Sequence, residues 1–404
     1  MIDDYSAMGH RFDSNLVTVK DLLYFSTLVF LFILPIRGLF TISASVTIGK
    51  VVGVLVGVIW IISVLKHRSE MALHKFHLVG ISFVSFPILS ILWSSYPPAT
   101  TLSSLRNIFL VGIILILSYT FASRKSIKPP LYAYTLGALI LCLLLLANYL
   151  IGNSFTAGRY TVGSLNPNSV AFSLVFSIPC ISYLGRSGKR KRVRIFLAGA
   201  AVIISLGIVL TGSRTAYVGL ASIFFYYTMR VITLRPKRSI PAIAIFTVVS
   251  VGFLYFLLPA EILSRFSSIP QEVLRGDLAS RTVQWSAGFE LLKSNPILGV
   301  GLGAFPGSVE PIIGYSVATD NTYLQILYEL GLIGIIFSAF LLRTVVSTVL
   351  NSQSSYMRIE FGSLVACCLV MALANDLAYH PILWSLLALF ASGNIQRVGN
   401  DMRK

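Results

Sequence analysis

Four arginines lie at the ends of apolar segments, where a charged side chain has few ordinary partners. They are Arg106, Arg159, Arg214 and Arg281. A planar guanidinium donates paired hydrogen bonds to phosphate and keeps its charge when it is partly buried. Each of these side chains could also extend to lipid headgroups without any further role. Arg214 has long apolar segments directly on both sides, so it has the strongest case as a phosphate ligand.

One carboxylate stands in a short polar run just before an apolar segment begins. Asp320 lies in the run 318–325, of sequence ATDNTYLQ. A carboxylate at a membrane boundary can take the proton of an attacking hydroxyl and so act as a general base. It can equally cap the helix that starts after it, because Asp and Asn are favoured at that position. The two roles are compatible, and the sequence leaves both open.

The remaining reactive side chains give weaker signals. His380 precedes Pro381 near the polar pair Asn375 and Asp376, and a lone histidine of this kind is more often structural than catalytic. No acidic cluster suits Mg²⁺, and no cysteine has the spacing of a metal ligand. We therefore expect neither a metal site nor a cofactor. The cysteines are predicted to be packed thiols inside apolar segments; they are Cys142, Cys180, Cys367 and Cys368.

The elements that must position these groups are membrane helices. Of the 404 residues 55% are hydrophobic and 12% are charged, whereas a soluble domain has about 25% charged residues. A membrane helix needs about 20 apolar residues, and we place twelve such windows in one polytopic, all-α domain over residues 1–404. The windows are 21–40, 46–65, 76–93, 104–121, 131–151, 167–185, 195–211, 213–230, 240–259, 321–342, 359–377 and 380–396.

The basic residues indicate how the chain is oriented. With the amino terminus in the cytoplasm, 23 of the 32 Lys and Arg fall in cytoplasmic segments and 9 on the opposite side. This asymmetry follows the positive-inside rule, so both termini are predicted to be cytoplasmic. The net charge of +17 is then mainly a topology signal, and we expect no nucleic acid as a partner. The four arginines face the outer leaflet, where a lipid-linked diphosphate is their natural ligand.

One connection, over residues 260–320, is long, and it lies outside the membrane between the ninth and tenth helices. The spacing of Arg281, Trp285, Phe289 and Leu292 predicts an amphipathic helix that ends before Pro296. The glycine-rich run 296–305 follows. No strand precedes this run, so we interpret it as a tight turn that returns the chain to the membrane and not as a dinucleotide site.

The order of these motifs resembles that of the O-antigen ligase/polymerase superfamily. The resemblance covers residues 90 to 335, and it rests on segments that are individually weak but occur in a characteristic order. They are 93–97 (WSSYP), 163–168 (GSLNPN), 213–219 (SRTAYVG), Arg281 with Trp285, 296–305 (PILGVGLGAF), Asn321 with Tyr323, and 329–334 (ELGLIG).

The resemblance implies metal-independent transfer of undecaprenyl-diphosphate-linked glycans at the outer face of the cytoplasmic membrane. The two functional arginines of the family correspond to Arg214 and Arg281. Ligases of the family have a histidine before the position of Asn321, and Asp320 stands there in this chain. Polymerases vary more at this position, so the resemblance favours a polymerase of repeat units.

The leading hypothesis is therefore an inverting glycosyltransferase that polymerises lipid-linked repeats of an O-antigen, capsule or exopolysaccharide. Arg214 and Arg281, helped by Arg159, would bind the donor diphosphate, and Asp320 would activate the acceptor. Supporting positions would be Asn321, Tyr323, Trp285, Arg106 and His380. A chain-length regulator is a further expected partner. The alternatives are a ligase that moves finished polymer to lipid A core and, from another class, a flippase for similar lipids. The window centres hold scarcely any charge, which disfavours an ion-coupled transporter.

Overall fold

The computed structural model describes residues 18–43, 46–67, 73–122, 126–155, 159–163, 165–234, 281–352 and 354–401, and within them the fold is helical apart from one short antiparallel pair of strands. The first part of the chain contains α1 (Val19–Ile33), η1 (Leu34–Ile36), β1 (Thr41–Ser43), β2 (Val46–Thr47), α2 (Ile48–His67), α3 (Lys75–Ser85), η2 (Phe86–Leu92), α4 (Pro97–Ala122) and α5 (Lys128–Leu150). The rest contains α6 (Pro167–Val175), α7 (Ser177–Ser187), α8 (Lys191–Leu210), α9 (Arg214–Leu234), α12 (Arg281–Ser294), α13 (Phe305–Ile313), α14 (Thr322–Leu350), α15 (Ser355–Met371) and α16 (Pro381–Asp401).

The described helices confirm an all-α, multi-pass membrane protein. Eight helical segments are long and apolar enough to cross a membrane, and each coincides with a predicted window. The windows 213–230, 359–377 and 380–396 are also helical, as α9, α15 and α16, although they are not among the eight. The window 240–259 lies outside the described residues. The total of twelve spans therefore stays a prediction.

Prolines break two of the predicted windows into two helical pieces. The window 76–93 is the α-helix α3 followed by the 3₁₀ helix η2, which has Pro87 at its start. The window 167–185 is divided at Phe176 into α6 and α7, and Pro179 follows in the first turn of α7. Because proline has no N–H, it cannot bond to the carbonyl four residues before it, and the helix ends or tightens there.

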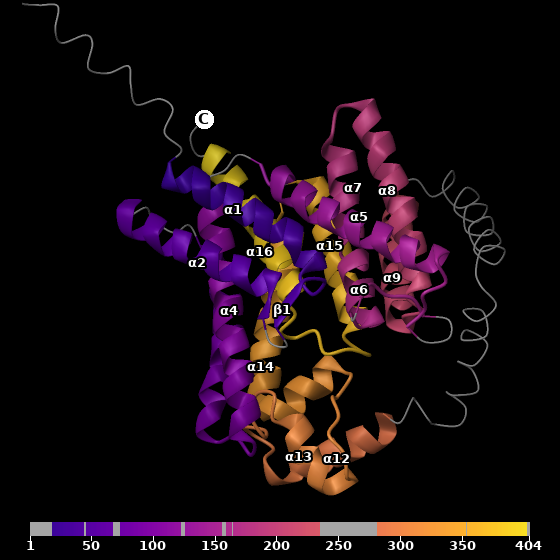
Figure 1. The fold of residues 1–404 in the computed structure, drawn as a ribbon. Coiled ribbons are helices and arrows are strands. Elements are labelled where there is room, and N and C mark those ends of the chain that lie inside the picture. Colours follow the sequence, from indigo (N-terminus) through magenta and orange to yellow (C-terminus); the bar gives the residue numbers. More distant parts are fainter. Residues whose placement is uncertain are drawn as a thin grey trace, which may run out of the picture.

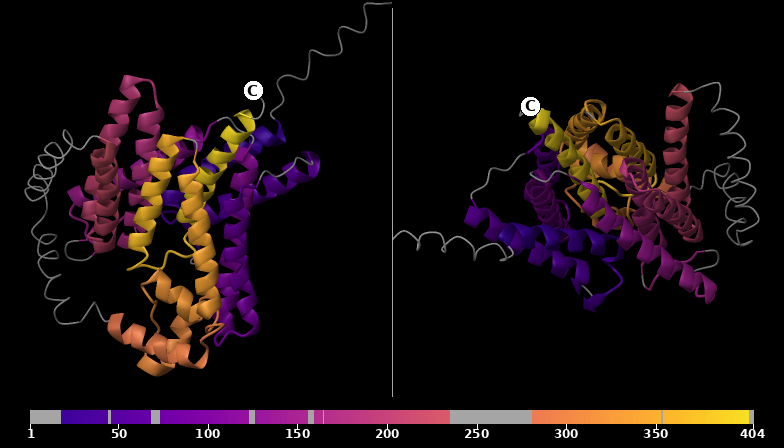
Figure 2. Two further views of the ribbon diagram at one scale, coloured as in Figure 1. Left: turned by 180° about the vertical axis from the view of Figure 1, so that it is seen from behind. Right: turned by 90° about the horizontal axis from the view of Figure 1, so that it is seen from above.

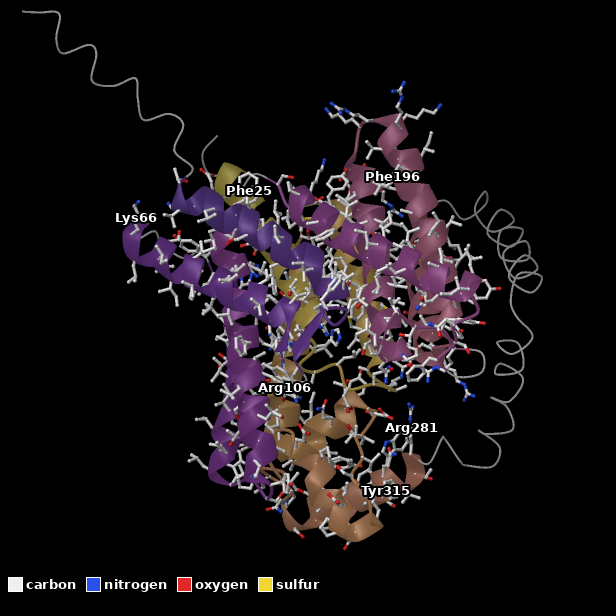
Figure 3. All side chains as sticks on the ribbon, in the orientation of Figure 1. Phe25, Lys66, Arg106, Phe196, Arg281 and Tyr315 are labelled. Atoms are coloured by element: carbon white, nitrogen blue, oxygen red, sulfur yellow. The ribbon has the colours of Figure 1, made fainter. Side chains whose placement is uncertain are left out.

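The long helices form one bundle, and α12 and α13 lie at one end of it (Figure 1). The beginning of α1, the connection between α7 and α8 and the end of α16 lie at the opposite end, as the view from behind also shows (Figure 2). Labelled side chains mark the two ends, with Lys66 and Phe196 at one and Arg281 and Tyr315 at the other (Figure 3). The bundle therefore has chemically distinct ends, and the candidate residues Arg281 and Asp320 belong to the end with α12.

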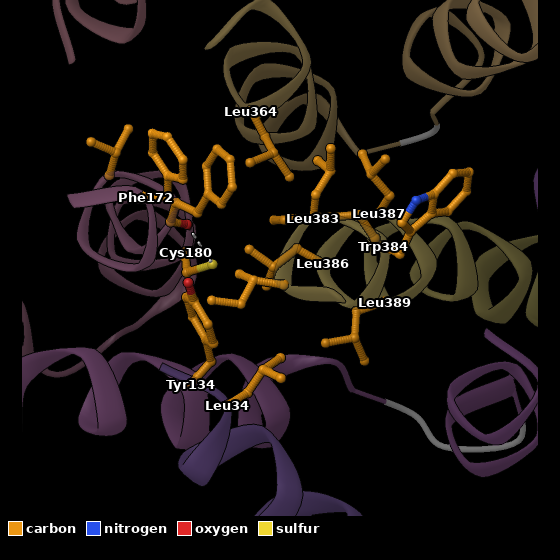
Figure 4. Close-up of a cluster of buried hydrophobic side chains, with 14 of the residues drawn as sticks. Leu34, Tyr134, Phe172, Cys180, Leu364, Leu383, Trp384, Leu386, Leu387 and Leu389 are labelled. Atoms are coloured by element: carbon orange, nitrogen blue, oxygen red, sulfur yellow. Dashed lines mark hydrogen bonds between the residues drawn. The ribbon is translucent and has the colours of Figure 1, made fainter. Parts of the chain in front are cut away.

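The bundle has a continuous apolar core in which α16 is central. Leu383 and Leu386 of α16 lie between that helix and Phe172 of α6 and Tyr134 of α5 (Figure 4). Trp384 lies on the other side of α16 and packs against Phe76 and Phe83 of α3. Large apolar side chains also cover the outside of the bundle, where a soluble protein would place polar ones. A surface of this kind suits contact with lipid. All four cysteines are free, three of them buried and Cys368 partly so, which fits packed thiols.

A second, smaller core lies at the outer end, named here for the side of the membrane predicted for it. We call the outer subdomain α12, residues 295–304, α13 and residues 322–330 of α14. Its core is formed by Ala287, Phe305, Val309 and Tyr328, all buried. The Phe305 and Tyr328 rings stack with their centroids 5.3 Å apart. This subdomain occupies the later part of the predicted external loop.

The predicted amphipathic helix exists as α12, but its buried face is rotated from the prediction. Gln284, Ala287 and Gly288 face inward, whereas Phe289 is half exposed. A Cβ atom on Gly288 would lie 2.3 Å from the Tyr328 ring. The helix therefore packs through its smallest side chains, because only these let the large Tyr328 ring approach. A prediction from the spacing of large apolar residues alone does not detect a buried face that contains glycine and alanine.

Candidate active site

The glycine-rich run is the hub of the outer subdomain. Its Val300 and Gly301 N–H groups donate to the Tyr328 and Glu329 carbonyls, at 2.9 and 2.8 Å. On its other side, Trp93 Nε1 donates to the Leu298 carbonyl at 3.1 Å. The first and the later motifs of the sequence, 93–97 and 329–334, thus contact each other through the segment between them. This explains why three weak motifs occur together.

Glycine is required in this hub because backbones approach closely. Gly299, Gly301 and Gly303 all have positive φ, as does Gly331 in α14. A Cβ atom on Gly331 would lie 2.3 Å from the Ile297 carbonyl oxygen. At Gly331 the backbone leaves helical geometry, so α14 is two helical pieces joined at a kink. The predicted window 321–342 is correspondingly broken, and its first ten residues belong to the outer subdomain.

Asp320 lies in the turn that leads into α14, in a strained conformation. Its φ is +48°, and it is the one described non-glycine residue with positive φ. Few non-glycine residues adopt this conformation, although Asp does so more readily than most, and residues held in it cluster at functional sites. The side chain is about half exposed, at 51%, so a substrate hydroxyl can reach it.

Asn321, and not Asp320, caps α14. The Asn321 side chain accepts hydrogen bonds from the N–H groups of Tyr323 and Leu324, at 3.0 and 3.1 Å. The interpretation of Asp320 as the helix cap is therefore wrong. Both residues have a capping side chain, but only Asn321 has the extended backbone that directs its side chain at the first helical turn. Asp320 is left available for another role.

The turn is held in place by the connection between α15 and α16, residues 372–380. Asp376 Oδ1 accepts hydrogen bonds from Thr319 Oγ1 at 2.6 Å and from the Asn321 N–H at 3.1 Å. Asn321 Nδ2 donates to the Leu373 carbonyl, and the Thr322 N–H donates to the Ala372 carbonyl. These bonds flank Asp320 on both sides and fix its backbone. A residue in an unfavourable backbone conformation persists only when its surroundings hold it in this way.

Asp376 is a buried carboxylate with no role assigned from the sequence. Burial raises its pKa above the usual range, and the neighbouring charge of Asp320 acts in the same direction, while the hydrogen bonds from Thr319 and Asn321 oppose the shift. Two carboxylates that lie close together resist simultaneous ionisation. In the sequence, the one indication of a role for Asp376 is its position beside Asn375 and near His380 in a polar run.

Arg281 and Asp320 meet, as the proposed site requires. Arg281 Nη2 lies 3.9 Å from Asp320 Oδ2 and donates to the Ala374 carbonyl at 3.4 Å. Trp285, one turn along α12, donates from Nε1 to the Thr319 carbonyl at 3.1 Å. The helix that begins with Arg281 is thus bonded to the residue before Asp320. Arg281 is one-quarter exposed, so its guanidinium remains accessible to an anion.

Arg214 begins α9, directly after the tight turn that joins α8 to α9. Gly212 in this turn has positive φ, and Tyr217 OH donates to the Val209 carbonyl at 2.6 Å across the turn. Gly219, further along α9, packs against Met371, which immediately precedes the 372–380 connection. The helix that begins with Arg214 therefore packs against α15 at the residue before this connection.

Arg159 is bound to the same turn from the side. Its Nε donates to the Thr211 carbonyl at 3.5 Å, and its Nη2 donates to Asn168 Oδ1 at 2.9 Å. Asn168 belongs to the first turn of α6, so Arg159 connects the outer ends of α6 and α8. This geometry favours a positioning role beside Arg214.

The supporting positions separate into two groups. Tyr323 OH donates to the Leu369 carbonyl at 2.8 Å, so Tyr323, Asn321 and Trp285 all brace the turn at Asp320. Arg106 is exposed on α4 and lies apart from Arg281 (Figure 3). The His380 ring packs against Phe172 and Phe176, and it is part of the membrane bundle and not of the turn.

The outer end thus combines a cation that can bind phosphate with a carboxylate that can accept a proton. Such a pair suits a displacement in which an anionic group leaves and a hydroxyl attacks. Residues 198–339 match a family model described as O-antigen ligase. This match supports the resemblance to the O-antigen ligase/polymerase superfamily. No curated protein matches the chain.

The matched family indicates a coarse activity. The protein is a glycosyltransferase-like membrane enzyme of the kind that polymerises or ligates glycans. Arg214, Arg281 and Asp320 all lie within the matched residues, whereas Arg159 and Asp376 lie outside them. The 372–380 connection, which holds the turn at Asp320, is therefore a contribution from the part of the chain beyond the match.

Proposed function

We propose that the protein polymerises oligosaccharide repeat units carried on undecaprenyl diphosphate, at the outer face of the cytoplasmic membrane. The observation that carries the proposal is the contact between Arg281 and Asp320. In this contact a guanidinium, a group able to bind phosphate, lies 3.9 Å from an accessible carboxylate whose residue has positive φ. The donor glycan leaves one lipid diphosphate and joins the hydroxyl of a second lipid-linked repeat.

The reaction is a single displacement with inversion. The acceptor oxygen forms a bond to the anomeric carbon, and the bond from that carbon to the diphosphate oxygen breaks. Asp320 takes the proton of the acceptor hydroxyl. Arg281 and Arg214 stabilise the charge that develops on the departing lipid diphosphate. This stabilisation needs no metal ion. Both termini then lie in the cytoplasm, opposite the site.

A reconstituted reaction tests the proposal. Purified protein in detergent is mixed with lipid-linked repeats, and the products are separated by size. We expect a ladder of polymers that remain on the lipid carrier, together with released lipid diphosphate. Polymer formation in detergent, where no second compartment exists, also excludes transport as the sole activity. Absence of any ladder from folded protein would contradict the proposal.

A ligase is the second candidate, because the matching family model is described as O-antigen ligase. A deletion strain separates the two functions through the glycans that accumulate. Loss of a polymerase leaves single repeats attached to the surface acceptor. Loss of a ligase leaves long chains on the carrier lipid. Asp320 stands at the position where ligases of the resembled superfamily have histidine. This difference supports the polymerase.

A further inference from the structure

Two arginines without an acidic partner lie at the end of the bundle opposite the outer subdomain, which we call the inner end. Arg230 is near the end of α9, and Arg358 is in the first turn of α15. The Nε atom of each is buried and makes no hydrogen bond, and neither side chain forms an ion pair within the described part of the chain. A guanidinium stays protonated in proteins, so each arginine brings an uncompensated positive charge to the bundle.

The packing of α9 against α15 determines how these two arginines lie. Near the outer ends of the helices, a Cβ atom on Gly219 of α9 would lie 2.5 Å from Met371 Sδ of α15. Further from the outer end, a Cβ atom on Gly362 of α15 would clash with the Tyr226 hydroxyl of α9. The contacts therefore advance along α9 as they go back along α15, which shows that the two helices are antiparallel.

Both arginines lie one helical turn beyond the contact between Tyr226 and Gly362. Arg230 follows Tyr226 by four residues, and Arg358 precedes Gly362 by four residues. Residues four apart share a helix face and are separated by about 6 Å along the helix axis. The two arginines are thus displaced in the same direction, and by the same length, from one point of contact. This register places them opposite each other at the inner end of the α9–α15 pair.

The one carboxylate in the neighbouring helices is already bonded. Glu360 is the single acidic residue of α7, α9 and α15 as the structure describes them. One of its oxygens accepts from Ser182 and pairs with Arg186, and the other accepts from Tyr227. Arg186 therefore has its counter-ion, and the two opposed arginines have none. A buried charge without a partner is strongly unfavourable unless an anion binds it.

The surface around the two arginines indicates which anion that is. Phe225 and Met229 of α9 and Tyr356 of α15 are all exposed, and large exposed apolar side chains suit contact with acyl chains. Basic sites between membrane helices on the cytoplasmic side bind anionic lipid headgroups, and the inner end is cytoplasmic in the predicted orientation. A ligand with a phosphate and acyl chains matches both parts of this surface.

We propose that Arg230 and Arg358 together bind the phosphate of an anionic phospholipid of the cytoplasmic leaflet. Guanidinium groups from two helices then donate to one headgroup, so the lipid joins the inner ends of α9 and α15. The same two helices carry candidate groups at their outer ends, because α9 begins at Arg214 and α15 leads into the 372–380 connection. The lipid site itself contains no residue assigned to glycan transfer.

Thermal unfolding of the purified full-length protein in a neutral detergent measures the binding. The midpoint is recorded with increasing dioleoyl phosphatidylglycerol and, separately, with dioleoyl phosphatidylcholine, which has no net charge. A ligand that binds the folded state raises the midpoint in proportion to its affinity and concentration. We expect phosphatidylglycerol to raise the wild-type midpoint more than phosphatidylcholine does. Equal effects of the two lipids would overturn the proposal.

Glutamine variants locate the site. Arg230→Gln and Arg358→Gln should each weaken the apparent affinity for phosphatidylglycerol by about 10- to 100-fold, the effect of losing a charge-assisted hydrogen bond. Arg192→Gln, which removes an exposed arginine from the first turn of α8 at the same end of the bundle, is the matched control and should keep the wild-type affinity. Wild-type affinity in both site variants, or an equal loss in the control, would contradict the assignment.

Arg230→Gln also separates binding from folding. Arg358 Nη2 donates to the Ser352 carbonyl at 2.9 Å, so its substitution removes an internal bond as well. The Arg230 side chain makes no hydrogen bond among the described residues, so Arg230→Gln should unfold at the wild-type midpoint in phosphatidylcholine. A lost response to phosphatidylglycerol in this folded variant supports the site, and a retained response overturns it.

Inorganic diphosphate distinguishes a lipid from a soluble phosphate. It replaces the lipid in the same titration, and we expect a much weaker response, because only a lipid also buries acyl chains against the apolar surface. A rise as large as that with phosphatidylglycerol, and lost in Arg230→Gln, would assign the site to a soluble anion and overturn the proposal. None of these measurements involves glycan transfer, so this site and the proposed function stand or fall separately.

Discussion

Two glutamates are buried at opposite ends of the bundle, and their surroundings differ. Glu360 of α15 is fully buried, and both of its carboxylate oxygens have partners: Ser182 Oγ at 2.9 Å and Arg186 Nε at 3.3 Å on one, Tyr227 OH on the other. Glu329 of α14, in the outer subdomain, is 2% exposed, and its Oε2 has no partner among the described residues. The Glu360 carboxylate is thus fully bonded, whereas the Glu329 carboxylate keeps one oxygen without a partner.

This difference distinguishes polar side chains that stabilise the fold from polar side chains that have atoms free to bind a ligand. The Glu360 network joins α7, α9 and α15, with the Arg186 guanidinium also 5.3 Å from the centre of the Tyr227 ring. Fully satisfied polar networks make a structure rigid. Around the 372–380 connection, by contrast, Asp320 has positive φ and His380 Nδ1 has no partner among the described residues. We therefore expect variants at the outer end to lose activity and variants at the Glu360 network to lose stability.

The largest expected effect is that of Asp320→Asn. Loss of a general base lowers kcat by about 10²- to 10⁴-fold. Asparagine tolerates positive φ, so the turn and the unfolding midpoint should be retained. Polymer formation is measured with lipid-linked repeats at matched amounts of protein. Full activity would leave Asp320 without a chemical role and would remove the contrast between the two ends.

Arg214→Lys follows, with an expected loss of about 10²- to 10³-fold in kcat. Lysine keeps the charge but cannot form the two parallel hydrogen bonds of a guanidinium. The same substitution at Arg281 should give a loss of similar size. Normal polymer from either folded variant would exclude that arginine from binding the donor diphosphate.

Glu360→Ala should reverse the pattern. It leaves Arg186 and Tyr227 without their shared partner and should lower stability by about 2–4 kcal/mol. This loss of stability is at the lower end of the range usual for a broken buried ion pair, because Arg186 is partly exposed. The unfolding midpoint in detergent is compared with activity per folded molecule. A variant that kept its midpoint but lost turnover would show that the network serves the reaction.

Gly331→Ala should affect fold and activity together. Positive φ at a residue with a Cβ atom is unfavourable by about 1–3 kcal/mol, and the Ile297 carbonyl oxygen leaves no space for that atom. Limited proteolysis of the outer subdomain, alongside the activity assay, measures both effects. Gly57, whose Cβ atom would meet nothing within 4 Å, provides the matched alanine control. Equal behaviour of the two variants would contradict the role of the hub.

The smallest expected effect is a change in the pH dependence of stability at Asp376. Because its pKa is raised in the folded protein, the unfolded chain loses the proton first. Stability therefore falls as the pH rises from about 4 through the folded pKa. In Asp376→Asn, whose side-chain oxygen still accepts from Thr319, this fall should be absent. The unfolding midpoints of the two proteins are compared over that range. Parallel curves would show that Asp376 does not titrate there.

The sequence predicted the helices well because lipid demands long apolar segments with every backbone group bonded internally. It also placed Arg281 and Asp320 in one candidate site, with separate roles, and in the structure the two side chains lie 3.9 Å apart. It did not separate Asp320 from Asn321 as the helix cap. Adjacent polar residues of similar capping preference look alike in sequence, and the choice depends on backbone angles that the bonds to Asp376 impose.

The outer end shows this division most clearly. The sequence by itself determined a helical membrane protein with arginines and a carboxylate at the ends of apolar segments. Only the tertiary structure decided that Asp376 fixes the turn at Asp320. These contacts join residues more than 50 positions apart in the chain. The periodicity of apolar residues predicts which side chains are buried. Whether a buried polar atom has a hydrogen-bond partner depends on the packed tertiary structure.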